Sequence, residues 1–486
     1  MRVSHSLDRV LAAAEAQRDR IVEMTSQLLA IESIRPEPPG GEDPMGDGCR
    51  ECLALAVELC RERGMEVRIH EGQVAVAEMG SAPENVALVV HMDTVPAGEG
   101  WTHPPFGGAV VDGEVWGRGA QDDKGPLASI LGAIDALIAE GAPLRRRITV
   151  IIGTDEETGA WRDLQAFHAA EPMPTMSIIT DADFPIINAE KGFANIVIET
   201  PKVEGAGEAQ LLEFTAGQRI NIVPDAARAL VAGISAEWLE QRARAFCLSR
   251  PEARITVEPM EAAALVTAAG TPTHASTPAN GHSALLDLAE FLAPEPFAPS
   301  AAERALRFVD QLLGQDLHGE RLGVFAHDPR MGLCTCSAGK VDATPDGAAR
   351  VWLNLRPVWG QTIDGVHRAI QAAAQALGER LGAEYVVTKD DTCREPLYVS
   401  DDSELVRGLR AAYERVTGQP ATCESIGGTT FAKAFDNAVV FGPCAPDEPG
   451  LAHERDERVS IEALVRNAKL YAAALWELAV DGEGAG

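Results

Sequence analysis

The chain has 486 residues, of which 46% are hydrophobic, so it has enough apolar material to build more than one globular core. Its 73 acidic residues outnumber its 42 basic residues and give a formal net charge of −31. Binding to nucleic acid or to an anionic membrane surface needs clustered positive charge, which this composition does not favour. We therefore expect neither nucleic acid nor a membrane among its partners.

The sequence also bears on the cellular compartment. It has no run of roughly eighteen apolar residues, the length of a transmembrane helix, and residues 1–20 read as an amphipathic helix instead of a signal peptide. Its nine cysteines are odd in number and do not resemble a disulfide framework. Cys49 and Cys52 form a C-x-x-C without a second ligand pair nearby, so we expect them to pack in a helix. These features predict a cytoplasmic protein.

The first strong strand signal is the run from Val86 to Val90, which breaks directly into His91 and Asp93. A short, continuous, β-branched run is typical of a strand covered on both faces, as in a parallel sheet. Ligands of such sheets bind beyond the carboxyl ends of the strands, which makes this strand end a candidate site. Taken alone, His91 could equally be a strand-end histidine with a local hydrogen bond.

Two further strands follow the same pattern, with helices between them. Residues 147–153 lead into Asp155, Glu156 and Glu157, and residues 176–180 lead into Asp181 and Asp183. The segment "GPLASILGAIDALIAEG" (125–141) has apolar residues at helical spacing and follows "GRGAQDD". That glycine-rich stretch lacks the spacing of a phosphate-binding loop. The alternation predicts an α/β fold with a mostly parallel sheet and helices on both faces.

The middle of the chain differs in character, since its short alternating strands predict an inserted α+β domain. A later strand and Pro/Gly-rich loop, "NAVVFGPCAPDEPGLAHERDE", carries His453, and a final helix near 460–480 has Ser460 as its candidate N-cap. We therefore predict one α/β domain split in sequence, residues 1–193 and 385–486, with a second domain, 194–384, between its halves.

The chemistry-bearing residues at these segment ends are His91, Asp93, Asp122, Glu156, Glu157, Asp181 and His453. Imidazole and carboxylate groups are ligands of Zn²⁺ and Mn²⁺. So many carboxylates could not remain ionised together without a cation to offset their repulsion. Each acidic stretch alone could be an exposed turn or a helix start. Their joint occurrence predicts a pair of divalent ions that share a bridging carboxylate.

Roles can be partly separated by local geometry. In an extended "HMD" segment His91 and Asp93 lie on the same side, so Asp93 can accept the second ring N–H of His91. The adjacent Glu156 and Glu157 should point in different directions. One of them can hold metal while the other faces the attacking water as a general base.

The motifs "HMDTVPAG", "GRGAQDDKGP", "GTDEETG", "DADFPIINAEKG", "GQRINIVPD", "THASTPANG", "LNLRP" and "LAHERDE" resemble the dinuclear zinc exopeptidases and deacylases. That family includes carboxypeptidase G, acetylornithine deacetylase, succinyl-diaminopimelate desuccinylase, aminoacylase and bacterial dipeptidases. The "DADFPIINAEKG" and "GQRINIVPD" stretches are most similar to PepV-type dipeptidases. The resemblance runs nearly end to end, and it implies a catalytic domain in two parts and an inserted lid domain.

The resemblance also implies a role for each matching residue. One ion would be bound by His91, Asp122 and Asp181, and the other by Asp122, Glu157 and His453. Asp93 would orient His91, Glu156 would be the general base, and the peptide bond from Asp122 to Asp123 would be cis. In the inserted domain, His274 would steady the oxyanion, while Asn221 and Arg356 would contact the substrate.

We therefore predict a metallopeptidase that hydrolyses dipeptides by means of a water activated by two divalent ions, with Glu156 as the base. Zn²⁺ is the expected ion, with Mn²⁺ or Co²⁺ as alternatives, and the long inserted segment favours a monomer. An N-acyl-amino-acid deacylase of the same fold is the first alternative. A non-catalytic metal-binding or peptide-binding protein is the second, although it would have no use for Glu156.

Overall fold

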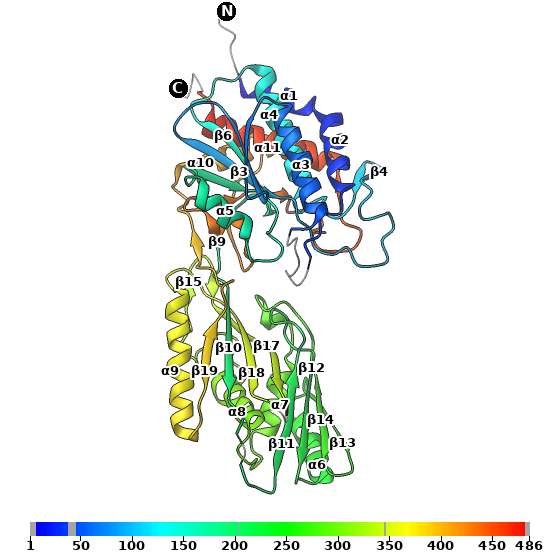
Figure 1. Cartoon of the computed structure of the whole chain (residues 1–486), viewed down its shortest axis with the longest axis vertical. Helices are drawn as coiled ribbons and strands as arrows, with labels where there is room; N and C mark the ends of the chain where they lie inside the picture. The colour runs from blue at the N-terminus through cyan, green and yellow to red at the C-terminus, as the bar shows by residue number, and fades with distance from the viewer. Residues whose placement is uncertain (1–5, 37–44, 204, 345–346, 482–486) are drawn as a thin grey trace, which may run out of the picture. The chain divides into compact units, whose positions relative to one another are not determined.

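The computed structural model describes residues 6–36, 45–203, 205–344 and 347–481. The chain forms two compact units. The first unit comprises Met1–Ala189, Tyr398–Ser425 and Thr430–Gly486. The second unit comprises Glu190–Leu397 and Ile426–Thr429 (Figure 1).

The first unit is built on a mixed sheet with a parallel centre. Its central neighbours are β6 (Arg147–Gly153), β3 (Asn85–His91), β7 (Met176–Ile179) and β22 (Ala438–Val440), which pair in parallel. Antiparallel strands flank them, namely β1 (Glu66–His70) and β2 (Val74–Met79) beside β6, and β9 (Ile186–Glu190) beside β22. Every residue of β3 is buried, so other elements cover both of its faces. The predicted α/β fold is confirmed, with parallel pairing confined to the centre of the sheet.

Helices surround this sheet. They are α1 (Leu7–Glu15), α2 (Arg18–Leu29), α3 (Asp47–Arg61), α4 (Lys124–Glu140), α5 (Arg162–Ala170), α10 (Glu404–Thr417) and α11 (Ile461–Ala479). Figure 1 shows α1 to α4 and α11 grouped beside β3 and β6. The long apolar α4 packs on α11 and ends at Gly141 in the left-handed region. As predicted, Ser460 caps α11 by accepting the N–H of Ala463, and Cys49 and Cys52 are fully buried in α3.

Short elements complete the first unit. A small sheet joins β4 (Ala109–Val111), β5 (Glu114–Trp116) and β24 (Arg458–Ser460). The remaining short pieces are β8 (Ala182–Asp183), β20 (Leu397–Tyr398), β21 (Cys423–Ile426), β23 (Pro443–Cys444) and the 3₁₀ helix η3 (Phe431–Ala434). The β24–β5 pairing places the segment after His453 beside the segment before Asp122.

The second unit contains a fully antiparallel sheet in the order β13-β14-β12-β11-β17-β18-β10-β19. These strands are β10 (Ala194–Thr200), β11 (Gln210–Ala216), β12 (Ala226–Ala232), β13 (Arg254–Pro259), β14 (Ala264–Ala269), β17 (Thr335–Ala343), β18 (Ala349–Arg356) and β19 (Val386–Lys389). Buried and partly exposed residues alternate along β10, which indicates a sheet with one face on a core. The predicted inserted α+β domain is thereby confirmed.

Helices pack on this second sheet. They are α6 (Ala236–Ser249), α7 (Ala284–Leu292), α8 (Ala301–Phe308) and α9 (Ile363–Leu381). The remaining pieces are η1 (Pro278–Asn280), the π-helix η2 (Val309–Leu313), β15 (His327–Asp328) and β16 (Gly332–Leu333). Across the described residues of both units, no helix combines the length and the apolar character that crossing a membrane requires.

Candidate metal centre

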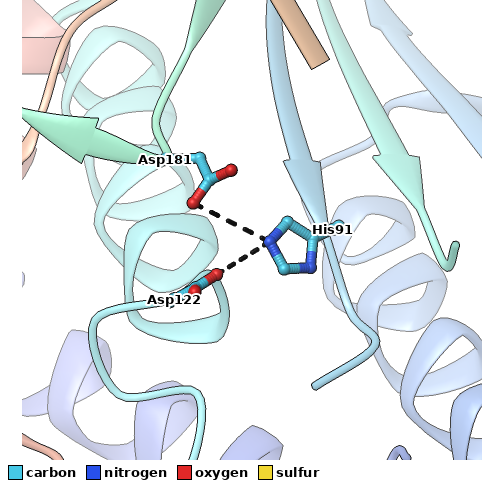
Figure 2. A group of neighbouring side chains, drawn as sticks. All are labelled: His91, Asp122 and Asp181. Atoms are coloured by element: carbon cyan, nitrogen blue, oxygen red, sulfur yellow. Dashed lines mark ion pairs between the residues drawn. The ribbon is translucent and has the colours of Figure 1, made fainter. Parts of the chain in front are cut away.

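His91, Asp122 and Asp181 form one cluster at the carboxyl end of the parallel strands. His91 is the last residue of β3, Asp181 follows β7, and Asp122 lies just before α4. The Nε2 atom of His91 is 2.8 Å from Oδ1 of Asp122 and 3.9 Å from Oδ1 of Asp181 (Figure 2). One ligand atom from each residue lies within 4.8 Å of the other two. The three side chains therefore converge on a volume that an ion can fill.

A second cluster shares Asp122 with the first. The Nε2 atom of His453 is 3.0 Å from Oδ2 of Asp122 and 3.1 Å from Oε2 of Glu157. Asp122 therefore directs Oδ1 towards His91 and Oδ2 towards His453. Its peptide bond to Asp123 is cis, in agreement with the resemblance. One carboxylate between two ligand groups is the arrangement by which two cations share a bridging ligand.

Two atoms of the first cluster fit a metal ligand role better than a hydrogen-bonding role. Nε2 of His91 and Oδ1 of Asp122 are buried and, although they lie 2.8 Å apart, neither makes a hydrogen bond among the described residues. Such orphaned polar atoms are rare in native proteins, because an unpaired buried group is destabilising. Imidazole nitrogen and carboxylate oxygen are also the donor types that Zn²⁺ binds. The residues present therefore fit a divalent cation.

Burial and mutual repulsion alter the acidity of the cluster. Burial raises the pKa of Asp181 to about 7, and the nearby carboxylate of Asp122 adds to the effect. Burial also raises the pKa of Glu156 well above its ordinary value, with Asp181 as the next cause. The carboxylates of Asp122 and Glu157 raise the pKa of His453 to about 11. The site thus stabilises positive charge and disfavours further negative charge.

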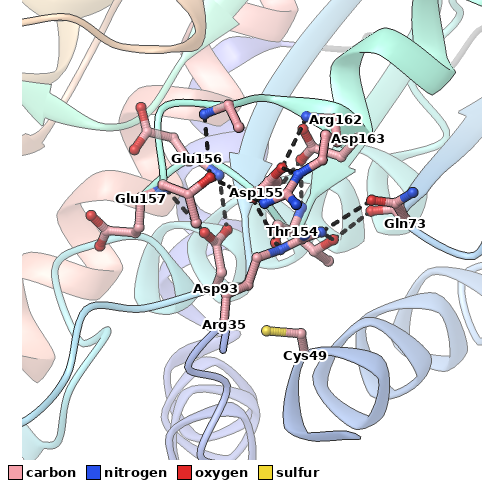
Figure 3. Close-up of polar contacts among 12 residues, drawn as sticks. Arg35, Cys49, Gln73, Asp93, Thr154, Asp155, Glu156, Glu157, Arg162 and Asp163 are labelled. Atoms are coloured by element: carbon pink, nitrogen blue, oxygen red, sulfur yellow. Dashed lines mark hydrogen bonds and ion pairs between the residues drawn. The ribbon is translucent and has the colours of Figure 1, made fainter. Parts of the chain in front are cut away.

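Asp93 connects the two "HMD" and "DEETG" segments. Its carboxylate is fully buried and accepts the backbone N–H groups of Glu156 at 3.2 Å and Glu157 at 3.0 Å (Figure 3). Nδ1 of His91 is 3.0 Å from the backbone oxygen of Asp93 and 3.4 Å from Oδ1. The predicted contact, from the ring of His91 to the carboxylate of Asp93, is thus longer than the contact from the ring to the backbone oxygen. The carboxylate of Asp93 mainly holds the loop that carries the two glutamates.

Glu156 and Glu157 differ in their surroundings, as adjacent residues should. Glu157 belongs to the second cluster, whereas neither group of ligand atoms found among the described residues includes Glu156. Glu156 is partly exposed. Figure 3 shows both glutamate side chains on the side of the loop opposite to Arg162 and Asp163. Glu156 therefore lies on the same loop as Glu157 but belongs to neither group of ligand atoms among the described residues.

The sequence analysis did not predict a buried ion pair between Arg118 and Glu457. The carboxylate of Glu457 is 2.7 Å from Nη1 of Arg118, and Nη2 of Arg118 donates to the carbonyl oxygen of His453 at 3.3 Å. The same carboxylate also accepts three backbone N–H groups of the loop before α4, those of Gly119, Gln121 and Asp122. Glu457 thus connects the segment that carries Asp122 to the segment that carries His453. The only sequence signal for Glu457 was its position in the motif "LAHERDE", which also contains His453.

The second unit carries the remaining predicted residues. The N–H of Ala275 donates to the backbone oxygen of Asn221 at 2.8 Å, and Ile222 forms a bridge with His274, so the segments of Asn221 and His274 are adjacent. Nδ1 of His274 is 2.6 Å from the hydroxyl oxygen of Ser276. Burial lowers the pKa of His274, and the charge of Arg356 adds to this.

Arg356 ends β18 in the same unit and is buried. Its Nε donates to the side-chain oxygen of Asn354 at 3.1 Å, and its Nη1 donates to the backbone oxygen of Gly427 at 2.9 Å. Its guanidinium lies 4.8 Å from the ring centre of Phe193. Burial lowers its pKa to about 10, which leaves it charged at neutral pH. Among the described residues, no carboxylate pairs with Arg356.

The structure therefore separates the predicted residues into three groups. Those that it brings together as ligand clusters are His91, Asp122, Glu157, Asp181 and His453. Asp93 and Glu156 lie beside the clusters, whereas Asn221, His274 and Arg356 belong to the second unit. Asp183, which follows the same strand as Asp181, is exposed and belongs to neither cluster of described residues.

Comparison with known proteins identifies the family of this chain. Residues 87–477 match the model of "Peptidase family M20/M25/M40". The chain belongs to peptidase family M20/M25/M40. This M20 peptidase is 32% identical over 472 residues to the putative dipeptidase YtjP of Bacillus subtilis (strain 168), with 95% of this chain and 98% of the relative covered. The predicted family and enzyme class, a metallopeptidase, are thereby confirmed.

Two further matches place this M20 peptidase among relatives of similar length. It is 29% identical over 472 residues to the beta-Ala-Xaa dipeptidase of Lactobacillus delbrueckii subsp. lactis, with 97% of this chain and 98% of the relative covered. The solved structure of the di-peptidase Dug1p from Saccharomyces cerevisiae matches with a TM-score of 0.59 at 14% identity, covering 98% of both chains. The latter match supports the fold.

Proposed function

We propose that this M20 peptidase is a dipeptidase that works with two divalent metal ions. The observation that carries the proposal is the pair of ligand clusters that share Asp122, with the accessible Glu156 beside them. Full-length similarity to relatives that are named dipeptidases supports the substrate class.

One ion would be held by His91, Asp122 and Asp181, and the other by Asp122, Glu157 and His453. The mixture of imidazole and carboxylate donors favours Zn²⁺, with Mn²⁺ and Co²⁺ as alternatives. When bound, the two ions would make a water more acidic and stabilise negative charge on the carbonyl oxygen of the substrate.

Glu156 would act as the general base. Its carboxylate accepts a proton from the attacking water, whose oxygen forms a bond to the carbonyl carbon. Glu156 then gives this proton to the leaving nitrogen as the C–N bond breaks, which produces a carboxylic acid and an amine. The second proton of the water passes from the acid to the amine, so a carboxylate and an ammonium group are released. Burial raises the pKa of Glu156, which favours return of the proton from its carboxyl group to the leaving nitrogen.

The second unit would act as the lid domain and the first as the catalytic domain. Arg356 would bind the terminal carboxylate of the substrate, since it is buried, charged and without a carboxylate partner among the described residues. His274 would donate a hydrogen bond to the developing oxyanion, and Asn221 would contact the substrate. We also expect the protein to be cytoplasmic and monomeric. Light scattering can check whether it is a monomer.

The test is hydrolysis by metal-free and metal-loaded protein. The purified chain is stripped with a chelator, dialysed, and reloaded with Zn²⁺, Mn²⁺ or Co²⁺. Each form is assayed on a dipeptide, its N-acetylated analogue, a tripeptide and an N-acetyl amino acid. We expect the loaded protein alone to cleave the dipeptide. Preference for the acetylated substrates would identify a deacylase, whereas binding without turnover would identify a non-catalytic protein.

A further inference from the structure

The loop between β6 and α5, residues 154–161, is closed by its own buried carboxylate. Asp155 is fully buried, and its Oδ2 accepts both the Nε–H of Arg162 at 2.7 Å and the backbone N–H of Arg162 at 2.9 Å. Its Oδ1 accepts the hydroxyl of Thr158 at 2.6 Å. The two glutamates of the site therefore lie in a loop whose ends are fastened together.

A second arginine reaches this loop from a distant part of the sequence. Arg35 follows α2, and only 2% of its side chain is exposed. Its Nε lies 3.2 Å from Oδ1 of Asp155 and also donates to the backbone oxygen of Thr154. Its Nη2 donates to the hydroxyl of Thr154 and to Oε1 of Gln73, both at 3.2 Å (Figure 3). One guanidinium thus holds the two residues that directly precede Glu156.

Asp93 holds the next two residues of the loop, because it accepts the N–H groups of Glu156 and Glu157. Thr154 and Asp155 also donate their N–H groups to the buried carboxylate of Asp163, at 2.6 and 2.9 Å. The two residues before Glu156, Thr154 and Asp155, are therefore held by contacts to their backbone and to their side chains. Among these groups, Arg35 is the one that donates to the carbonyl oxygen of Thr154. It also pairs with Asp155, as Arg162 does.

We propose that Arg35 is a positioning residue that places the carboxylate of Glu156 for proton transfer. The proposal depends on the proposed function, in which Glu156 is the base. Arg35 acts through Thr154 and Asp155, and it is a member of neither ligand cluster. It also lies outside residues 87–477, the part of the chain that matches the family model. A displacement of about 1 Å at a catalytic group lowers rates on the order of 100-fold.

The main experiment compares Arg35→Met with a matched control, Arg63→Met. Arg63 is a second buried arginine of the first unit, bonded to Asp135 at 2.6 Å and remote from the loop in its contacts. For R35M we expect kcat to fall about 10- to 100-fold, while KM changes less than about threefold and two ions per chain remain bound. For R63M we expect lower thermal stability with kcat per folded molecule unchanged.

A readout independent of turnover is amide hydrogen exchange in the peptide that spans residues 154–158. R35M should accelerate exchange there, whereas R63M should not. If R35M does not fold, Arg35→Lys replaces it, with R63K as control, because lysine keeps the charge but lacks the planar fork. R35K should then lower kcat at least about threefold and accelerate the same exchange, whereas R63K should do neither.

Three results would overturn the proposal. One is a kcat for the Arg35 variant equal to that of its control. Another is loss of bound metal in step with activity, which would mean that Arg35 acts through Glu157. The third is unchanged exchange in residues 154–158. If the wild-type chain cleaves no dipeptide, the proposed function fails by itself, and the exchange measurement still decides whether Arg35 fixes the loop.

Discussion

The carboxylate of Glu457 accepts the backbone N–H of Asp122 at 3.3 Å, so the residue shared by both clusters is tied to the segment that carries His453. Glu457 is fully buried and pairs with Arg118, which in turn contacts the carbonyl oxygen of His453. Partners behind metal ligands orient the ligands, and their loss commonly weakens metal binding. The spacing of the two clusters therefore depends on Glu457.

Replacement of Glu457 by Gln should weaken metal binding about 10- to 100-fold, because the amide nitrogen cannot accept the N–H groups that face it. Competitive titration with a chromophoric chelator measures this affinity. The exposed Glu454 of the same loop supplies the control, Glu454→Gln, which should bind metal like the wild type. Equal affinities in the two variants would show that Glu457 contributes only to folding.

Replacement of Glu156 by Gln should lower kcat about 100- to 10,000-fold, because the amide cannot accept the proton of the water. The metal content, measured by atomic absorption, should stay at two ions per chain. Glu157→Gln is the informative contrast, since it should lower the metal content through loss of a ligand. A Glu156→Gln variant that turns over at the wild-type rate would refute the assignment of the base.

The two ions should leave the protein in separate steps. The side chain of His453 is 55% exposed, whereas that of His91 is 1% exposed, so water and chelator reach the His453 cluster more easily. With rising chelator concentration we expect the metal content to fall from two ions to one and then to none. His453→Ala should remove the first step and retain the second. A single two-ion step in the wild-type protein would contradict this difference between the clusters.

Arg356→Met should raise KM for a dipeptide about 10- to 100-fold, through loss of charge-assisted hydrogen bonds to the terminal carboxylate. The matched substrate is the amide of the same dipeptide, which lacks that charge. The variant and the wild type should then differ little on the amide. An equal loss on both substrates would place the carboxylate-binding group elsewhere.

The sequence predicted that His91 and Asp181 would lie close together because of the geometry of parallel strands. His91 and Asp181 come at or just after β3 and β7, and such strands end at the same edge of a sheet. The sequence pattern also predicted that the adjacent Glu156 and Glu157 point in different directions, and the family resemblance assigned a role to each. For Asp93 the sequence predicted a contact with the ring of His91, but its carboxylate mainly accepts backbone N–H groups, which no side-chain pattern reveals.

The groups that fix the ligand loops were not predictable in the same way. Arg118 meets Glu457 across most of the length of the chain, and Arg35 meets Asp155 only once the segment after α2 has packed beside β6. The partners of each pair are far apart in the sequence, so no local spacing or periodic pattern indicates that they meet. A buried ion pair depends on the approach of two distant segments, and that approach is a property of the folded chain.

β22 occupies the middle of the central sheet, between β7 and β9, although it belongs to the last part of the chain. During translation, a ribosome must therefore synthesise most of the polypeptide before this sheet can close. Residues 190–397 form a continuous stretch that can fold earlier. His453 emerges later than β22, so the second ligand cluster can be completed only after most of the chain has been synthesised.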